Sequence, residues 1–163
     1  MGFIDMAKQI EQEGIQHYHR LAEETPYREM AGIFEYLARE EQRHYDIFDA
    51  WQKKHKAPEI ERTDIAQRAK KVFERLTKDI DSLGVAAIDQ DDAYYKALTL
   101  EKNSVSVYTE MLAKTQSPEQ EKQLHFIIGQ EESHMRLVQS LMEFQRHPHE
   151  WLENAEWHHF DEY

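Results

Sequence analysis

The chain has 163 residues, a formal net charge of −12 at pH 7, and hydrophobic residues at 40% of its positions. This length fits one domain with a continuous core, and the acidic balance argues against a nucleic-acid partner. The sequence contains no Cys, which excludes disulfides, thiol-based peroxidase chemistry and an iron site with four thiolate ligands.

The sequence has no evident targeting or membrane signal. Its first residues lack a basic region followed by an apolar core, and the longest apolar run, residues 83–88, is too short to span a bilayer. We therefore expect a cytoplasmic protein with no membrane partner.

The first predicted helix runs from about Ile4 to Glu24, because apolar residues recur there with a helical period. Glu11 lies on the apolar face of this helix, whereas Glu13 lies on the opposite face. The following Thr-Pro pair at Pro26 ends the helix.

A second helix is predicted from about Arg28 to His55, and the short link before it makes the first two helices antiparallel neighbours. Its apolar face includes two polar residues, Glu41 and His44. A Glu and a His three positions apart project from the same side of a helix, so both can reach one bound cation.

Residues 59–92 are predicted to form a crossover between the second and third helices. Apolar residues repeat with a helical period from Ile65 to Leu83, and Gly84 is expected to end this segment. A connection of this length allows the third bundle helix to run parallel to the second.

Two further long helices are predicted after the crossover. The third bundle helix runs from about Asp91 to Lys114, with Glu101 on its apolar face. The fourth runs from about Glu119 to Arg146 and carries Glu131 and His134 among its apolar residues.

We assign residues 1–147 to the bundle and residues 148–163 to a C-terminal tail. The region from His147 onward contains two Trp and four His. The aromatic residues are expected to pack on the bundle or on a second subunit. The four histidines show no recognisable metal-ligand spacing.

An internal repeat relates the two halves of the chain. Glu131 and His134 lie 90 residues after Glu41 and His44. The same offset relates further pairs: Glu11 and Glu101, Tyr18 and Tyr108, Thr25 and Thr115, and Pro58 and Pro148.

The sequence therefore predicts an all-α, antiparallel four-helix bundle with one long helical crossover and a short C-terminal tail. Two helices offer a single Glu each and two offer a Glu-x-x-His pair, which is the known pattern of di-metal carboxylate bundles. The candidate ligands are Glu11, Glu41, His44, Glu101, Glu131 and His134. Four carboxylates balance two divalent cations, and these oxygen and nitrogen donors suit Fe or Mn, with Zn as a substitute.

Tyr18 and Tyr108 lie on the same faces as these ligands. They are either core aromatics whose hydroxyls find some partner, or donors of hydrogen bonds to ligand carboxylates.

Three segments, IEQEGIQHYHRLAEET, LAREEQRHYDIF and LEKNSVSVYTEML, resemble the rubrerythrin branch of the ferritin-like superfamily. The resemblance covers nearly all of residues 4–146 and implies a ferritin-like bundle whose iron ligands fall on the six residues above. It also places Tyr18 and Tyr108 beside the metals.

The chain departs from family patterns at several positions. A full rubrerythrin adds a rubredoxin domain with four cysteines, so electrons are expected here from a separate donor protein. Typical rubrerythrins carry an extra carboxylate one turn after the third-helix Glu, where this chain has Ser104. Bacterioferritin-like proteins have a haem-binding Met where this chain has Gln42.

The resemblance implies a non-haem di-iron oxidoreductase that reduces hydrogen peroxide, or oxygen, and forms a homodimer or larger homo-oligomer. We expect Glu41 and Glu131 to bridge the metals, with Glu11 and Glu101 as terminal ligands. The alternatives are a ferroxidase or iron-sequestering protein, and a metal-free helical interaction module.

Overall fold

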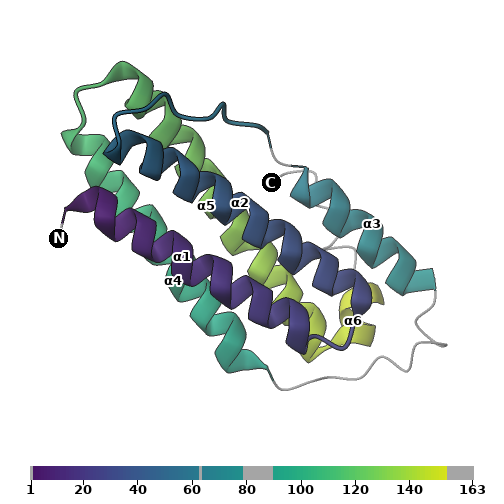
Figure 1. Cartoon of the computed structure of the whole chain (residues 1–163). Coiled ribbons are helices and arrows are strands. Elements are labelled where there is room, and N and C mark those ends of the chain that lie inside the picture. Colours follow the sequence, from purple (N-terminus) through teal and green to yellow (C-terminus); the bar gives the residue numbers. More distant parts are fainter. Residues whose placement is uncertain (1, 63, 79–89, 154–163) are drawn as a thin grey trace.

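The computed structural model describes residues 2–62, 64–78 and 90–153 (Figure 1). The helices are α1 (Phe3–Glu24), α2 (Arg28–Gln52), α3 (Ile65–Lys78), α4 (Asp91–Lys114), α5 (Pro118–Arg146) and α6 (Pro148–Glu153). No strand occurs among these described residues. The predicted all-α four-helix bundle with a helical crossover is confirmed.

The bundle consists of two antiparallel hairpins, α1 with α2 and α4 with α5, which pack together through α1 and α4. Figure 1 shows that α2 and α4 run in the same direction, as the predicted crossover requires. The crossover helix α3 lies outside the four long helices against α2, and α6 packs against α5 and α3.

The end of α2 differs from the prediction, because the helix ends at Gln52 rather than at His55. Lys54 has a φ of 58°, in the left-handed region. The backbone N–H groups of Lys54 and His55 donate to the carbonyls of Trp51 and Ala50, at 3.1 and 2.8 Å. This is the Schellman pattern, which usually has Gly at the left-handed position. Because this position holds Lys rather than Gly, the sequence does not indicate that the helix ends here.

Two helices begin one residue earlier than predicted. Helix α5 begins at Pro118 rather than Glu119, because Pro fits the first turn and the Ser117 side chain accepts a hydrogen bond from the Gln120 N–H at 3.3 Å. Helix α1 begins at Phe3. These shifts do not change which residues face the core.

The apolar core forms two clusters, one toward each end of the bundle. The first contains Phe34 and Leu37 of α2, and the second contains Ile47 and Phe48 of the same helix. Residues of the other three long helices divide between the clusters in the same way. The middle turns of each long helix, between the two clusters, therefore carry other kinds of side chain.

Helix α3 and the tail pack together through aromatic rings. Phe73 of α3 is fully buried, and its ring centroid lies 4.3 Å from that of Trp151 in α6. Trp151 also lies 6.1 Å from Phe144 of α5. This part of the tail packs on the bundle. The expected helix end at Gly84 and the tail histidines after residue 153 lie outside the described residues.

None of the helices in the described part of the chain is both long enough and apolar enough to cross a membrane.

Candidate metal centre

The six predicted ligands meet in the middle of the bundle, between the two apolar clusters. They come from all four long helices: Glu11 from α1, Glu41 and His44 from α2, Glu101 from α4, and Glu131 and His134 from α5. Each of these residues is at most 3% exposed. Burial of so many ionisable groups is costly unless they are paired or bind cations.

The six residues form two overlapping groups in which the potential ligand atoms all lie within 4.8 Å of one another. One group contains Glu11, Glu41, His44 and Glu131, and the other contains Glu41, Glu101, Glu131 and His134. Glu41 and Glu131 belong to both groups. This is the arrangement that two bridging and two terminal carboxylates would have.

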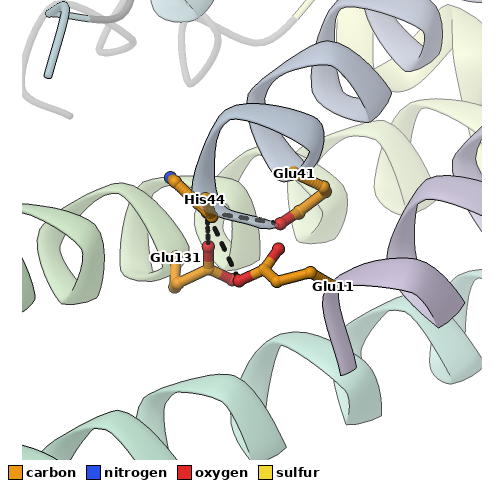
Figure 2. Close-up of side chains that lie close together, drawn as sticks. All are labelled: Glu11, Glu41, His44 and Glu131. Carbon is orange, nitrogen blue, oxygen red and sulfur yellow. Dashed lines mark ion pairs between the residues drawn. The ribbon is translucent and has the colours of Figure 1, made fainter. Parts of the chain in front are cut away.

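In the first group, three carboxylates surround Nδ1 of His44 (Figure 2). This nitrogen lies 2.6 Å from Glu131 Oε1, 3.4 Å from Glu41 Oε2 and 3.6 Å from Glu11 Oε1. The 2.6 Å contact is an ion pair, and neither of its two atoms has a hydrogen-bond partner among the described residues. Figure 2 shows the other ring nitrogen pointing away from the carboxylates.

The second group is built in the same way around His134. Its Nδ1 lies 3.1 Å from Glu41 Oε1 and 3.4 Å from Glu101 Oε1. The His44 and His134 rings are nearly parallel, with centroids 6.1 Å apart and planes 20° apart. Each imidazole therefore directs the same nitrogen into the shared space between the hairpins.

Burial raises the pKa of three of the four carboxyl groups. The pKa values of Glu11 and Glu131 lie well above their usual value because the side chains are desolvated and lie close to Glu41. The pKa of Glu101 is raised for the same reasons. Burial alone would raise the Glu41 pKa, but the charge of His134 and the polar contacts with His134 and His44 together outweigh it and hold the Glu41 pKa well below its usual value.

The pKa values of the two imidazoles are set mainly by the neighbouring carboxylates. Desolvation lowers their pKa values, but the neighbouring carboxylates, chiefly Glu131 at His44 and Glu101 at His134, outweigh it. The pKa of each histidine therefore lies well above its usual value. In metal-free protein, imidazolium ions supply positive charge that bound cations would otherwise supply.

The donor set fits two divalent ions. Glu131 Oε2, Glu11 Oε2 and Glu101 Oε2 are buried and have no hydrogen-bond partner among the described residues. Buried carboxylate oxygens normally have such partners, so these atoms are available as ligands. Four carboxylates and two imidazoles could hold two ions of the Fe or Mn type.

Two tyrosines hold the single carboxylates in place. The Tyr18 hydroxyl of α1 donates to Oε1 of Glu101, and the Tyr108 hydroxyl of α4 donates to Oε1 of Glu11. Burial raises the pKa of both hydroxyls well above its usual value, so both remain protonated donors. Of the two alternatives left open by the sequence, the structure places both hydroxyls on candidate ligands.

Sequence analysis missed two buried polar residues beside the centre. Glu40 Oε2 lies 2.5 Å from Nε2 of His134, and Gln130 Oε1 lies 2.7 Å from Nε2 of His44. Each immediately precedes a candidate ligand, and the two are 90 residues apart. The internal repeat could have found them, because they occupy equivalent positions in its two halves.

Two small residues also shape the centre. At Gly14, an added Cβ would lie 3.5 Å from Cγ of Glu41, so α1 passes close to this carboxylate. Ser104 is buried one turn after Glu101, and its hydroxyl donates to the Leu100 carbonyl at 3.1 Å. Position 104 therefore offers no carboxylate to the centre.

A cavity of about 160 Å³ lies on the outer side of His44. Its walls include Glu40, Arg43, His44, Gln130 and the crossover residues 58–61. This volume can hold a few small molecules of the size of water or hydrogen peroxide. The cavity therefore adjoins one of the two groups of candidate ligands.

A comparison with protein-family models matches residues 2–142 to the family described as Rubrerythrin. The chain belongs to the rubrerythrin family. Neither a comparison with curated proteins nor one with solved structures found a match. Membership of this family supports a ferritin-like di-iron protein, and the buried glutamate and histidine groups could hold the metal.

Proposed function

We propose that this rubrerythrin-family protein reduces hydrogen peroxide at a non-haem di-iron centre, with electrons from a separate donor protein. The observation that carries the proposal is the pair of overlapping ligand groups that share Glu41 and Glu131. Two ferrous ions bound there would supply the two electrons that, with two protons, convert one hydrogen peroxide into two water molecules.

The protein residues would hold the ions and control access to them. Glu41 and Glu131 would bridge, while Glu11 with His44 and Glu101 with His134 would complete the two subsites. The apolar clusters on either side would keep bulk water away from the centre. Peroxide would reach the His44 side through the adjoining cavity.

The deciding experiment is an anaerobic titration of the metal-free protein with ferrous ion, followed by oxidation with either hydrogen peroxide or oxygen. We expect saturation near two irons per chain and faster oxidation by peroxide than by oxygen. Iron uptake well beyond two per chain would favour the ferroxidase or storage alternative. Failure to retain iron or manganese would favour a metal-free interaction module.

The assembly and the electron donor are part of the same proposal. The family resemblance favours a homodimer or larger homo-oligomer, which light scattering of the purified protein would test. The absence of Cys from the sequence favours a donor on another protein. Turnover with peroxide that requires an added reductase system would support that arrangement.

A further inference from the structure

The distal nitrogen of each candidate ligand histidine contacts a residue from the opposite hairpin. His134 of α5 contacts Glu40 of α2 at 2.5 Å, and His44 of α2 contacts Gln130 of α5 at 2.7 Å. Glu40 is 1% exposed and Gln130 is 8% exposed. The two contacts cross between the hairpins at equivalent positions of the internal repeat.

Both contacts fix how the histidines are protonated. A carboxylate oxygen and an amide oxygen accept hydrogen bonds, so Nε2 of each imidazole carries the donated proton. The Gln130 amide is oriented by its own N–H, which donates to the Glu61 carbonyl at 3.3 Å. In a metal-bound state, Nδ1 of both histidines would then be the ligand atom.

The two contacts differ in charge, which breaks the symmetry of the repeat. Glu40 places a fifth buried carboxylate behind His134, whereas Gln130 places a neutral amide behind His44. A carboxylate partner makes an imidazole a stronger electron donor to a metal than an amide partner does. It also adds negative charge near one subsite only.

We infer that Glu40 and Gln130 are positioning residues that make the two metal subsites unequal. The subsite of His134 and Glu101 binds a divalent ion first and more tightly, and the subsite of His44 and Glu11 binds the second ion more weakly. His44 lines the cavity, so the weaker subsite is the one beside it. The inference rests on the proposed metal binding but not on the reaction with peroxide.

The test uses Co²⁺ and the full-length metal-free protein, with NMR of the histidine ring protons as the main readout. An imidazole bound through Nδ1 keeps its Nε2 proton, and paramagnetic Co²⁺ shifts that signal away from the diamagnetic spectrum. The His44→Ala variant assigns the two signals. We expect the His134 signal to appear with the first equivalent of Co²⁺ and the His44 signal with the second.

A charge exchange then tests the cause. The double variant Glu40→Gln/Gln130→Glu keeps every ligand and the total charge but moves the carboxylate behind His44. We expect the order of the two signals to reverse. Calorimetry should show that Glu40→Gln alone weakens the first Co²⁺ site by about tenfold or more. The control Glu132→Gln, at an exposed position beside Glu131, should change neither site.

Three results would contradict the inference or its basis. Simultaneous growth of both signals in the wild-type protein would overturn the inequality of the subsites. An order that the charge exchange leaves unchanged would show that Glu40 and Gln130 do not cause it. Those results would leave the proposed di-metal centre standing. Absence of any Co²⁺ binding would overturn the metal centre itself.

Discussion

Tyr18 of α1 donates its hydroxyl hydrogen bond to Glu101 of α4, across the interface between the two hairpins. Tyr108 of α4 makes the corresponding bond to Glu11 of α1. Neither hairpin therefore orients its own single carboxylate. The candidate metal centre forms only when the two halves of the chain pack together.

Removal of one tyrosine hydroxyl should destabilise the metal-free protein. In Tyr18→Phe, Glu101 loses its donor while its other oxygen already lacks a hydrogen-bond partner in the described part of the chain. We expect the free energy of unfolding to fall by about 1–2 kcal/mol in urea denaturation.

Tyr94→Phe is the matched control for this change. Tyr94 is also fully buried, but its hydroxyl has no hydrogen-bond partner among the described residues. Its loss should change the free energy of unfolding by less than about 0.5 kcal/mol. Equal losses in the two variants would show that the hydroxyl bond to Glu101 contributes nothing specific.

Glu131 and Glu132 allow a sharp comparison of adjacent residues. Glu131 belongs to both ligand groups, whereas Glu132 is exposed. We expect Glu131→Ala to reduce the bound metal, measured by elemental analysis after dialysis, from two ions per chain to one or none. Glu132→Ala should still retain two. Retention of two ions by both variants would remove Glu131 from the centre.

The stability of the metal-free protein should fall as the pH rises. The pKa values of His44, His134, Glu11, Glu101 and Glu131 are raised by folding. Each such group contributes stability that is complete below its unfolded pKa, near 6.5 for His and 4.5 for Glu, and is lost as the pH rises through the folded pKa. We expect the melting temperature in EDTA to decrease as the pH rises above about 6.5, the usual pKa of histidine.

The metal-loaded protein should show the opposite trend over the same interval, because metal binding requires deprotonated ligands. Glu41 has a lowered pKa, so its stabilising contribution is lost only as the pH falls below about 4.5, outside this interval. Thermal melts with and without Co²⁺ will measure both trends. Parallel pH profiles for the two forms would show that the raised pKa values do not belong to metal ligands.

Ser104 tests the cost of an additional carboxylate. Ser104→Glu would place another acidic group on the buried face of α4, one turn after Glu101. We expect the free energy of unfolding of the metal-free protein to fall by about 2 kcal/mol or more, with part of the loss recovered when Co²⁺ binds. Ser104→Ala removes only a hydroxyl bonded to its own helix and should be nearly neutral.

The result for Ser104→Glu depends on repulsion within the centre. If the Glu variant is as stable as the Ala variant in the absence of metal, the carboxylates around Glu101 are not under electrostatic strain. In that case, Co²⁺ should not raise the free energy of unfolding of Ser104→Glu more than that of Ser104→Ala.

Most of the fold could be predicted from the sequence because the helices are long and amphipathic. The period of the apolar residues located all four bundle helices, and polar residues within the apolar stripes marked the candidate centre. The end of α2 could not be predicted, because Lys54 adopts the left-handed conformation usually given to Gly. Local backbone hydrogen bonds hold Lys54 in this conformation, and they cannot be recognised from the residue types in the sequence.

The positions of Glu40 and Gln130 could not be derived from helical periodicity alone. Both precede a ligand by one residue and would be placed on the edge of the apolar stripe. They become buried because α2 and α5 face each other across the centre, so each side chain reaches the histidine of the opposite helix. That contact depends on the packing of elements far apart in the sequence.

The contact between Phe73 and Trp151 has a consequence for synthesis of the chain. The α1–α2 hairpin can form early on the ribosome, because its contacts are local. Phe73 of the crossover helix, however, cannot make this contact until Trp151, which lies 78 residues later in the chain, has been synthesised. We therefore expect the apolar face of α3 to stay accessible to chaperones in nascent chains until α6 has left the exit tunnel.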